Sequence, residues 1–237
     1  MNKPGWGLIL LVAALACPVA TLAQNAVDMG QEPDHTLLIE NEYLRAFRVE
    51  IPRLQSTLVH RHDHDYVIIT LTDSRMKAAK PGEAPITFTR YAGDIRYIYG
   101  PFAHSVTNDE VTPYADVTVE IYKGDTSRYN GYLSTDTFKN ILGPGIDTNA
   151  SYAVTLDKSG VKIWNVQLLA GDSQSRVEHQ SGGQLIVAVN HVKLKWDSPE
   201  VNLSLDPGEV KWIPRGSSYK VANTGREPAR FVILEMR

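Results

Sequence analysis

Four histidines in the first half of the chain have a type and spacing that could bind a transition metal. His60, His62 and His64 stand at alternate positions, and His104 follows downstream. Because side chains on a strand alternate with a period of two, three imidazoles at alternate positions project from the same face. Two histidines on one strand and a third on a strand paired nearby would supply three nitrogen ligands, which suits Zn, Fe, Ni or Cu.

The residues around this cluster favour a strand. The run 56–59 before it and the run 67–71 after it are rich in β-branched and apolar residues, which are enriched in strands. A solvated edge strand is the simpler interpretation, because polar residues on an edge discourage pairing between sheets. The additional imidazole of His104 favours the metal site over the solvated edge.

The same residues resemble the two sequence motifs of the cupins. The first motif is a Gly, then His-x-His, three or four residues, a Glu and a later Gly; here the His-x-His pair begins at His60, and Tyr66 follows after three residues. The second motif is Gly, five residues, Pro-x-Gly, two residues, His, three residues and Asn, which Gly93, His104 and Asn108 match. The resemblance implies a small jelly-roll β-barrel with a metal bound inside it.

The chain departs from the cupin motifs at three places. Tyr66 stands where the family has its Glu ligand, Leu54 replaces the leading Gly, and residues 99–101 read Tyr-Gly-Pro instead of Pro-x-Gly. These departures count against the glutamate-assisted chemistry of the family, but not against its fold.

The second half of the chain repeats the first. The hexapeptides that begin at Gly93 and Gly208 agree in residue class at all six positions. The same offset places three residues of the first half, His104, Asn108 and Pro113, opposite Tyr219, Asn223 and Pro228. Repeated short strands between Gly and Pro turns predict two all-β units of one fold.

The expected architecture is therefore all-β, with two tandem cupin (jelly-roll) barrels after a signal peptide. The predicted organisation is a signal peptide over 1–23, an N-terminal barrel with the metal site over 32–123, a linker over 124–150 and a C-terminal barrel over 151–237. At the four positions that bind metal in the family, the second barrel carries Val177, His179, Gln184 and Tyr219. One imidazole does not hold a catalytic metal, so the second barrel is predicted to have lost its ligands.

The resemblance assigns the metal ligands to His60, His62 and His104. Three histidines leave coordination positions open for water, a substrate oxygen or dioxygen. The expected cofactor is a divalent transition metal: Fe, Zn, Ni, Mn or Cu. Three-His cupins include thiol and diketone dioxygenases, so the missing Glu does not exclude oxygen chemistry.

Tyr66 is the candidate catalytic residue. Its phenol, with an ordinary pKa near 10, could donate a hydrogen bond to a ligand on the metal. The alternative is a barrel aromatic that caps the site. Asp63, His64 and Asp65 have two interpretations: either carboxylate could orient a ligand histidine, or all three could face water.

The remaining segments receive simpler interpretations. His35 is expected in a loop, His191 at a strand end, and His179 as a buried remnant. Residues 24–34 are predicted to be a flexible lead-in, 74–84 a surface loop, and 135–142 a short helix. Strands are expected over 36–40, 43–51, 87–90, 115–122 and 161–168.

The N-terminus has the pattern of a secretory signal peptide. A cationic start, an apolar run from Leu8 to Ala16 and small residues before Gln24 predict cleavage after Ala23 and a periplasmic or secreted protein. The apolar run is too short to span a bilayer, which takes about 20 residues. The only cysteine is Cys17. A lipoprotein lipidated at Cys17 is the alternative.

Charge and composition narrow the partners. The 237 residues carry a net charge of −3, which provides no basic field for nucleic acid or anionic lipid. A small-molecule substrate or ligand is the expected partner, and a homodimer stays open. Three hypotheses follow: a metal-dependent, oxygenase-like enzyme acting on a small organic molecule, a small-ligand-binding module without turnover, and a structural protein clamped by its metal.

Overall fold

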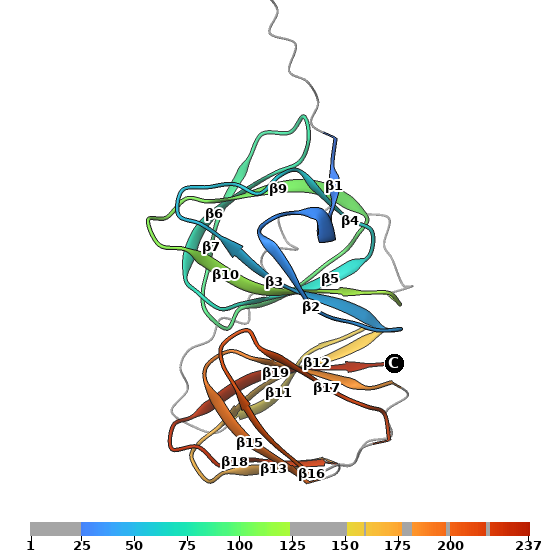
Figure 1. Ribbon diagram of the computed structural model, residues 1–237, viewed down its shortest axis with the longest axis vertical. Helices are drawn as coiled ribbons and strands as arrows, with labels where there is room; N and C mark the ends of the chain where they lie inside the picture. The colour runs from blue at the N-terminus through green and yellow to red at the C-terminus, as the bar shows by residue number, and fades with distance from the viewer. Residues whose placement is uncertain (1–24, 124–150, 159, 177–181, 198–199, 217–218) are drawn as a thin grey trace, which may run out of the picture.

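Two β-barrels, one above the other, make up the structure (Figure 1). The computed structural model describes residues 25–123, 151–158, 160–176, 182–197, 200–216 and 219–237. Within them the helical structure is a single 3-10 turn, η1 (Met29–Gln31), and no helix is long and apolar enough to cross a membrane. The all-β, two-barrel prediction is confirmed. The predicted signal peptide, linker and short helix lie outside the described residues.

The first barrel consists of two five-stranded sheets, ordered β1-β4-β9-β6-β7 and β2-β3-β10-β5-β8. The strands of this barrel are β1 (Val27–Asp28), β2 (His35–Glu40), β3 (Leu44–Ile51), β4 (His60–His62), β5 (Asp65–Thr70), β6 (Ser74–Ala79), β7 (Ile86–Arg90), β8 (Ile95–Ile98), β9 (Phe102–Asn108) and β10 (Tyr114–Ile121). The predicted strands 36–40, 43–51, 87–90 and 115–122 correspond to β2, β3, β7 and β10, with ends within one residue.

The second barrel repeats this topology. Its sheets are ordered β11-β12-β19-β14-β17 and β13-β18-β15-β16, the same order of equivalent strands as in the first barrel without β1. The strands are β11 (Ser151–Asp157), β12 (Val161–Leu168), β13 (Ser173–Arg176), β14 (Gln184–Ala188), β15 (Val192–Asp197), β16 (Glu200–Leu205), β17 (Val210–Ile213), β18 (Tyr219–Asn223) and β19 (Ala229–Met236). The internal repeat predicted from the sequence is thus visible in the strand order.

The repeat extends to single hydrogen bonds. Asn108 Nδ2 donates to the carbonyl oxygen of Thr112 over 2.8 Å. Asn223 Nδ2 donates to the carbonyl oxygen of Glu227, also over 2.8 Å. Each asparagine ties the end of a strand to the turn that follows it, because its amide satisfies a backbone carbonyl that the sheet leaves unpaired.

The backbone of three turns explains why the motifs require glycine at these positions. Gly93 and Gly208 have φ values of 90° and 83°, which glycine adopts without a steric cost. Leu54, where the first motif carries Gly, has φ 56°. A side chain in this left-handed region is strained, so the departure from the motif changes the residue but not the backbone.

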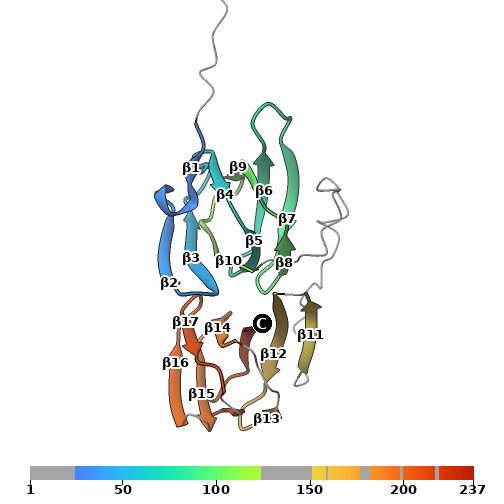
Figure 2. The same cartoon turned by 90° about the vertical axis from the view of Figure 1, so that its right-hand side faces the viewer.

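The two barrels share a hydrophobic core. The sheet that contains β3, β10 and β5 faces the second barrel with its outer side (Figure 2). Apolar residues of this side, including Val67, Val117 and Val119, form one buried cluster with Val187 and Leu234 of the second barrel. Every residue of β10 is buried. The strand that carries the inner wall of the first barrel is therefore supported from behind by the second.

The prediction of a flexible lead-in over 24–34 is wrong for the residues described. Val27 and Asp28 form β1, which pairs in parallel with β4. Met29 is 0% exposed. The Asp28 side chain accepts a hydrogen bond from the backbone of Gly30 and so caps the 3-10 turn. The segment is mostly polar in composition, but burial of the single apolar side chain of Met29 is enough to hold it against the barrel.

The prediction of a surface loop over 74–84 is also wrong. β6 occupies residues 74–79 and pairs with both β7 and β9. Ser74 and Met76 are buried, while Arg75 between them is exposed. This alternation, masked by a Lys- and Ala-rich composition, places one face of β6 inside the barrel.

The histidine run is not one continuous strand. β4 ends at His62 and β5 begins at Asp65. Gly100 packs against the break so closely that a Cβ there would lie 2.3 Å from the carbonyl oxygen of His64. The bend turns His64 away from the other imidazoles.

Candidate metal centre

Three of the predicted ligands come together inside the first barrel. His60 and His62 project from β4, and His104 projects from the adjacent β9, where it pairs directly with His60. One nitrogen of each ring lies within 4.8 Å of the others. His64 does not join them, since its ring packs against Tyr122 at 5.0 Å between centroids.

Burial keeps these imidazoles neutral. It lowers the pKa of His60 to about 4, and the neighbouring His35 contributes in the same direction. Burial also holds the pKa of His62 and of His104 well below the usual value, and the adjacent imidazoles add to it. A neutral imidazole has one nitrogen lone pair, which is the form that binds a metal.

The hydrogen bonds select which nitrogen faces the centre. His60 Nδ1 lies 3.0 Å from the carbonyl oxygen of Leu58 and donates to it, so its Nε2 carries the lone pair. The Nε2 atoms of His62 and His104 lie 3.3 Å apart. Because Nδ1 of His62 faces Glu120, its Nε2 directs a lone pair toward His104, where a proton on His104 or a bound cation can meet it. The donor set therefore fits a transition metal.

A buried carboxylate lies behind His62. Glu120, on β10, has its side chain 0% exposed and places Oε1 3.3 Å from Nδ1 of His62. No described residue gives either atom another polar partner. A carboxylate at the rear nitrogen of a ligand histidine fixes its tautomer and ring orientation.

Glu120 is itself held by a chain of ionic contacts. Arg45 Nε donates to Glu120 Oε2 over 2.5 Å, and its two terminal nitrogens donate to Asp28 over 3.1 and 3.2 Å. Burial alone would lower the pKa of Arg45, but the hydrogen bonds to the two carboxylates raise it above the usual value. Arg45 therefore stays charged.

Neither interpretation of the residues 63–65 holds for all three: the carboxylates of Asp63 and Asp65 bond elsewhere than to a ligand histidine, and Asp65 is buried and does not face water. Asp63 forms an exposed ion pair with Arg61. Asp65 accepts hydrogen bonds from the Tyr97 hydroxyl and the Gly100 amide. Sequence reasoning missed Glu120, although an acidic residue at an inward position of the closing strand 115–122 was a usable signal.

Tyr66 lies beside the candidate centre. Its ring stacks on His62 with centroids 3.9 Å apart and an interplanar angle of 10°. The residue is 1% exposed, and its hydroxyl has no hydrogen-bond partner among the described residues. Burial raises the pKa of Tyr66, so the phenol stays protonated. Its hydroxyl group can therefore donate a hydrogen bond to a ligand in the cavity.

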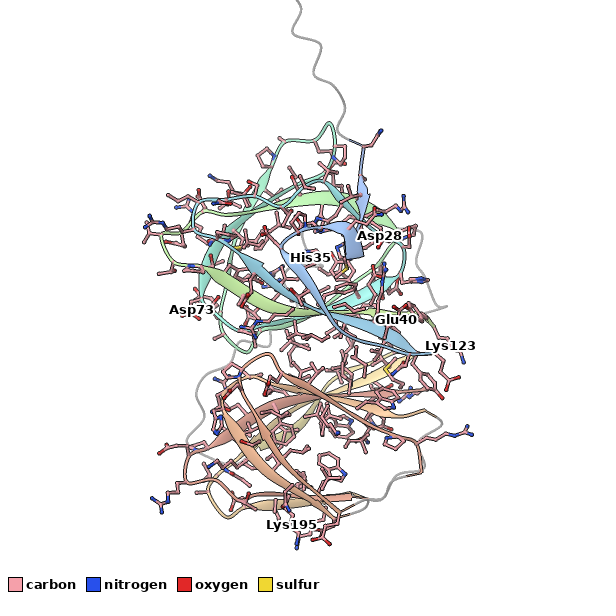
Figure 3. The ribbon with its side chains drawn as sticks, viewed as in Figure 1. Asp28, His35, Glu40, Asp73, Lys123 and Lys195 are labelled. Atoms are coloured by element: carbon pink, nitrogen blue, oxygen red, sulfur yellow. The ribbon has the colours of Figure 1, made fainter. Side chains whose placement is uncertain are left out.

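The placement of His35 in a loop is wrong. His35 is the first residue of β2, and Figure 3 shows it within the upper barrel. Its ring meets His60 edge to face at 4.9 Å, and its Nδ1 donates to the carbonyl oxygen of Met29 over 3.1 Å. No motif spacing connects His35 to the other histidines, so only the packing of η1 and β2 reveals it.

A cavity of about 170 Å³ opens beside the three histidines. Its walls come from both sheets, and the hairpin between β6 and β7 forms part of its rim. The apolar part of the lining includes Val49, Ile51, Ile68, Met76, Ala78, Ala79, Ala84, Ile86, Phe88, Ile98, Phe102 and Val106. An apolar cavity with a few converging polar groups is typical of small-molecule sites.

The described residues of the second barrel contain no comparable group of metal-ligating side chains. Gln184, the counterpart of Tyr66, is 0% exposed. Val177 and His179 lie outside the described residues, so the predicted loss of ligands in this barrel stays a prediction.

Solved structures resemble both barrels together. A cupin 2 conserved barrel domain protein from Leptotrichia buccalis matches with a TM-score of 0.55 and 8% identity, over 86% of this chain and 88% of that one. Oxalate decarboxylase from Lactobacillus farciminis, in a formate complex, matches with a TM-score of 0.57 and 12% identity, over 86% and 84%. The chain has the cupin fold, in two copies.

The cupin fold is the extent of this likeness. No family model and no curated protein matches the sequence. Bacillus subtilis oxalate decarboxylase has Mn(II) centres and matches with a TM-score of 0.57 and 10% identity, over 86% of this chain and 75% of that one. At such low identity the neighbours establish the fold, and their chemistry remains their own.

Proposed function

We propose that this protein is an exported, metal-dependent enzyme of oxygenase-like chemistry that acts on a small organic molecule in the first barrel. The observation that carries the proposal is the convergence of three buried, neutral imidazoles beside a largely apolar cavity. Structural zinc sites are normally closed by four protein ligands, whereas three leave positions open for exchange.

His60, His62 and His104 would hold the metal, which when bound supplies Lewis-acid or redox chemistry to a ligand in the cavity. Glu120, clamped by Arg45, fixes the ring of His62. The apolar walls exclude water, which strengthens polar interactions inside the site.

Tyr66 is proposed to donate a hydrogen bond from its hydroxyl to the bound substrate. The stacking on His62 fixes its ring, and the hydroxyl has no described partner that would compete. A donor fixed in advance stabilises developing charge without reorganisation.

Export is proposed from the N-terminal sequence. β1 begins at Val27, so cleavage after Ala23 would leave the described fold intact. Mass spectrometry of the exported protein tests this: a mass that begins at Gln24 supports cleavage there, and a lipidated Cys17 contradicts it.

The proposed activity is tested by identifying the metal in the purified protein and following oxygen uptake with small phenols, diketones and carboxylic acids. Uptake that is lost in His104→Ala and reduced in Tyr66→Phe supports the proposal. Redox-silent zinc without oxygen uptake for any compound contradicts oxygenase chemistry. Tight binding without turnover would indicate a ligand-binding module instead.

A further inference from the structure

A buried arginine lines the cavity without an ionic partner. Arg90 is the last residue of β7 and is 3% exposed. It follows Ile86 and Phe88 at the alternate positions that face the cavity. Its Nη1 is buried without a hydrogen bond, and no described carboxylate forms an ion pair with it. Its guanidinium does contact the ring of Phe88, at 4.4 Å from the centroid.

Such a charge is costly in a folded protein. Arginine is almost never fully buried unless it is paired, and an unpaired buried ion loses its hydration without compensation. A cation–π contact compensates for only part of the lost hydration free energy. The arrangement is explained if a partner for Arg90 enters from the cavity.

Arg90 lines the same cavity as the candidate metal ligands. Its charge acts to lower the pKa of Tyr114 and Asp116. It acts in the same direction on Tyr66 and His104. The largely apolar cavity thus presents a buried cation as well as the candidate metal centre.

The polar groups around Arg90 favour an anion over a cation as its partner. Asp116 already accepts hydrogen bonds from the hydroxyl groups of Thr118, at 2.8 Å, and Tyr114. Burial raises its pKa to about 6, so it is mostly ionised at neutral pH, but these hydroxyl groups already satisfy its carboxylate. Arg90 Nη1 has no such partner, so it is the group that lacks a counter-charge.

We infer that Arg90 is the anchor for the carboxylate of a small, otherwise apolar organic acid. The planar guanidinium matches a carboxylate through two parallel hydrogen bonds, and the apolar walls accommodate the rest of the molecule. The acid would extend from Arg90 toward the histidines. The inference names a substrate class for the function proposed above and rests on it for the role of the metal, but not for the anion site itself.

Three isosteric probes test the anchor in the holoprotein: benzoate, benzamide and benzamidine, which carry a charge of −1, 0 and +1. Calorimetric titration is expected to show the tightest binding for benzoate. Arg90→Gln should weaken the binding of benzoate at least about tenfold, which corresponds to one charge-assisted hydrogen bond. The affinity for benzamide should not change. Arg90→Lys should restore part of the loss.

Three results would overturn the inference. Benzamide could bind as tightly as benzoate, or benzamidine could bind best, which would assign the site to Asp116. Benzoate affinity could also be unchanged in Arg90→Gln, which would place the carboxylate on the metal.

Thermal unfolding of the same variants distinguishes a structural role of Arg90 from a role in binding the ligand. Removal of an unpaired buried charge should leave the midpoint unchanged or raise it, so a large fall contradicts the inference. If Arg90→Gln does not fold, Asp116→Asn replaces it. This change removes a negative charge that competes for Arg90, so benzoate should bind more tightly. Weaker binding of benzoate would contradict the role of Arg90 as the anchor.

Metal content, measured on the same samples, separates this inference from the proposed function. A protein without a metal site that still prefers benzoate through Arg90 overturns the proposed function alone. A metal-loaded, active protein without that preference overturns the anchor alone.

Discussion

The two barrels share a topology but differ in what fills them. Their strand registers give the correspondence: Tyr66 pairs with Glu120 across β5 and β10, and Gln184 pairs with Glu235 across β14 and β19. Glu120 and Glu235 are therefore equivalent. In the first barrel this carboxylate lies behind His62, and in the second it accepts a hydrogen bond from the indole of Trp164.

The inward positions along these closing strands differ in polarity. Asp116 and Thr118 of the first barrel line the cavity. Their counterparts in the second barrel are Phe231 and Ile233, both 0% exposed within an apolar cluster. The exchange replaces polar groups that face a cavity with side chains that fill it.

A second difference between the barrels is the size of one inward side chain. Ala78 pairs with Val106, and Trp196 pairs with Val221 at the equivalent place. Ala78 lines the cavity, whereas Trp196 is 0% exposed. The two barrels therefore share one framework but use its interior differently: apolar side chains fill the second barrel, whereas the first has a cavity lined by polar and charged groups.

The largest expected effect is on the packed barrel. Trp196→Ala should lower the free energy of unfolding by about 3–5 kcal/mol, because it leaves a large cavity in a filled core. Chemical denaturation measures the loss. Phe88→Ala, on the cavity wall of the first barrel, is the control and should cost clearly less. Equal losses would contradict the difference in packing.

A smaller effect concerns the carboxyl group of Asp116. Burial raises its pKa from 3.8 to about 6, so the folded state holds the proton more tightly than the unfolded state. Stability should therefore fall as the pH rises from 4 to 6, by about 2–3 kcal/mol at 1.36 kcal/mol per pKa unit.

Denaturant midpoints of the wild type and Asp116→Asn at pH 4 and pH 7 measure this contribution. The asparagine variant keeps the shape and loses the titration, so it should gain stability relative to the wild type as the pH rises. A difference that does not change with pH would show that Asp116 titrates normally.

The equivalent glutamates should differ in their effect on metal binding. Glu120→Gln should weaken metal affinity about 10- to 100-fold, because His62 loses the carboxylate that orients it. Glu235→Gln is the matched control and should leave the affinity unchanged. Competition with a metal-sensitive dye measures both, and equal effects would contradict a metal site confined to the first barrel.

The smallest expected effect is at the strained turn before β4. Leu54→Gly should raise the free energy of unfolding by about 1 kcal/mol, because glycine relieves the left-handed backbone. The equivalent change in the opposite sense, Gly171→Ala in the second barrel, should destabilise, since Gly171 has φ 80° and a side chain there is strained. Urea denaturation tests the pair, and a destabilised Leu54→Gly would contradict the strain.

The fold and the three candidate metal ligands could be predicted from sequence motifs, because both depend on residue spacing along strands and turns. His60, His62 and His104 lie on neighbouring strands, and Gly93 recurs as Gly208 at a turn with positive φ. Patterns of this kind survive in the sequence because the backbone requires them locally.

The rest of the site depends on long-range contacts that no spacing encodes. Glu120 meets His62 from a strand that closes the barrel 58 positions later. Arg90 faces the cavity only because β6 and β7 form a hairpin inside the sheet, where the composition predicted a loop. His35 reaches His60 through a segment predicted to be flexible.

The most direct test of an active first barrel and a silent second one is the metal content of purified protein and its single-histidine variants, by elemental mass spectrometry. We expect one metal ion per chain in the wild type and in His179→Ala, and loss of that ion in His60→Ala, His62→Ala and His104→Ala. Full metal content in His104→Ala, or loss of the metal in His179→Ala, would contradict the account.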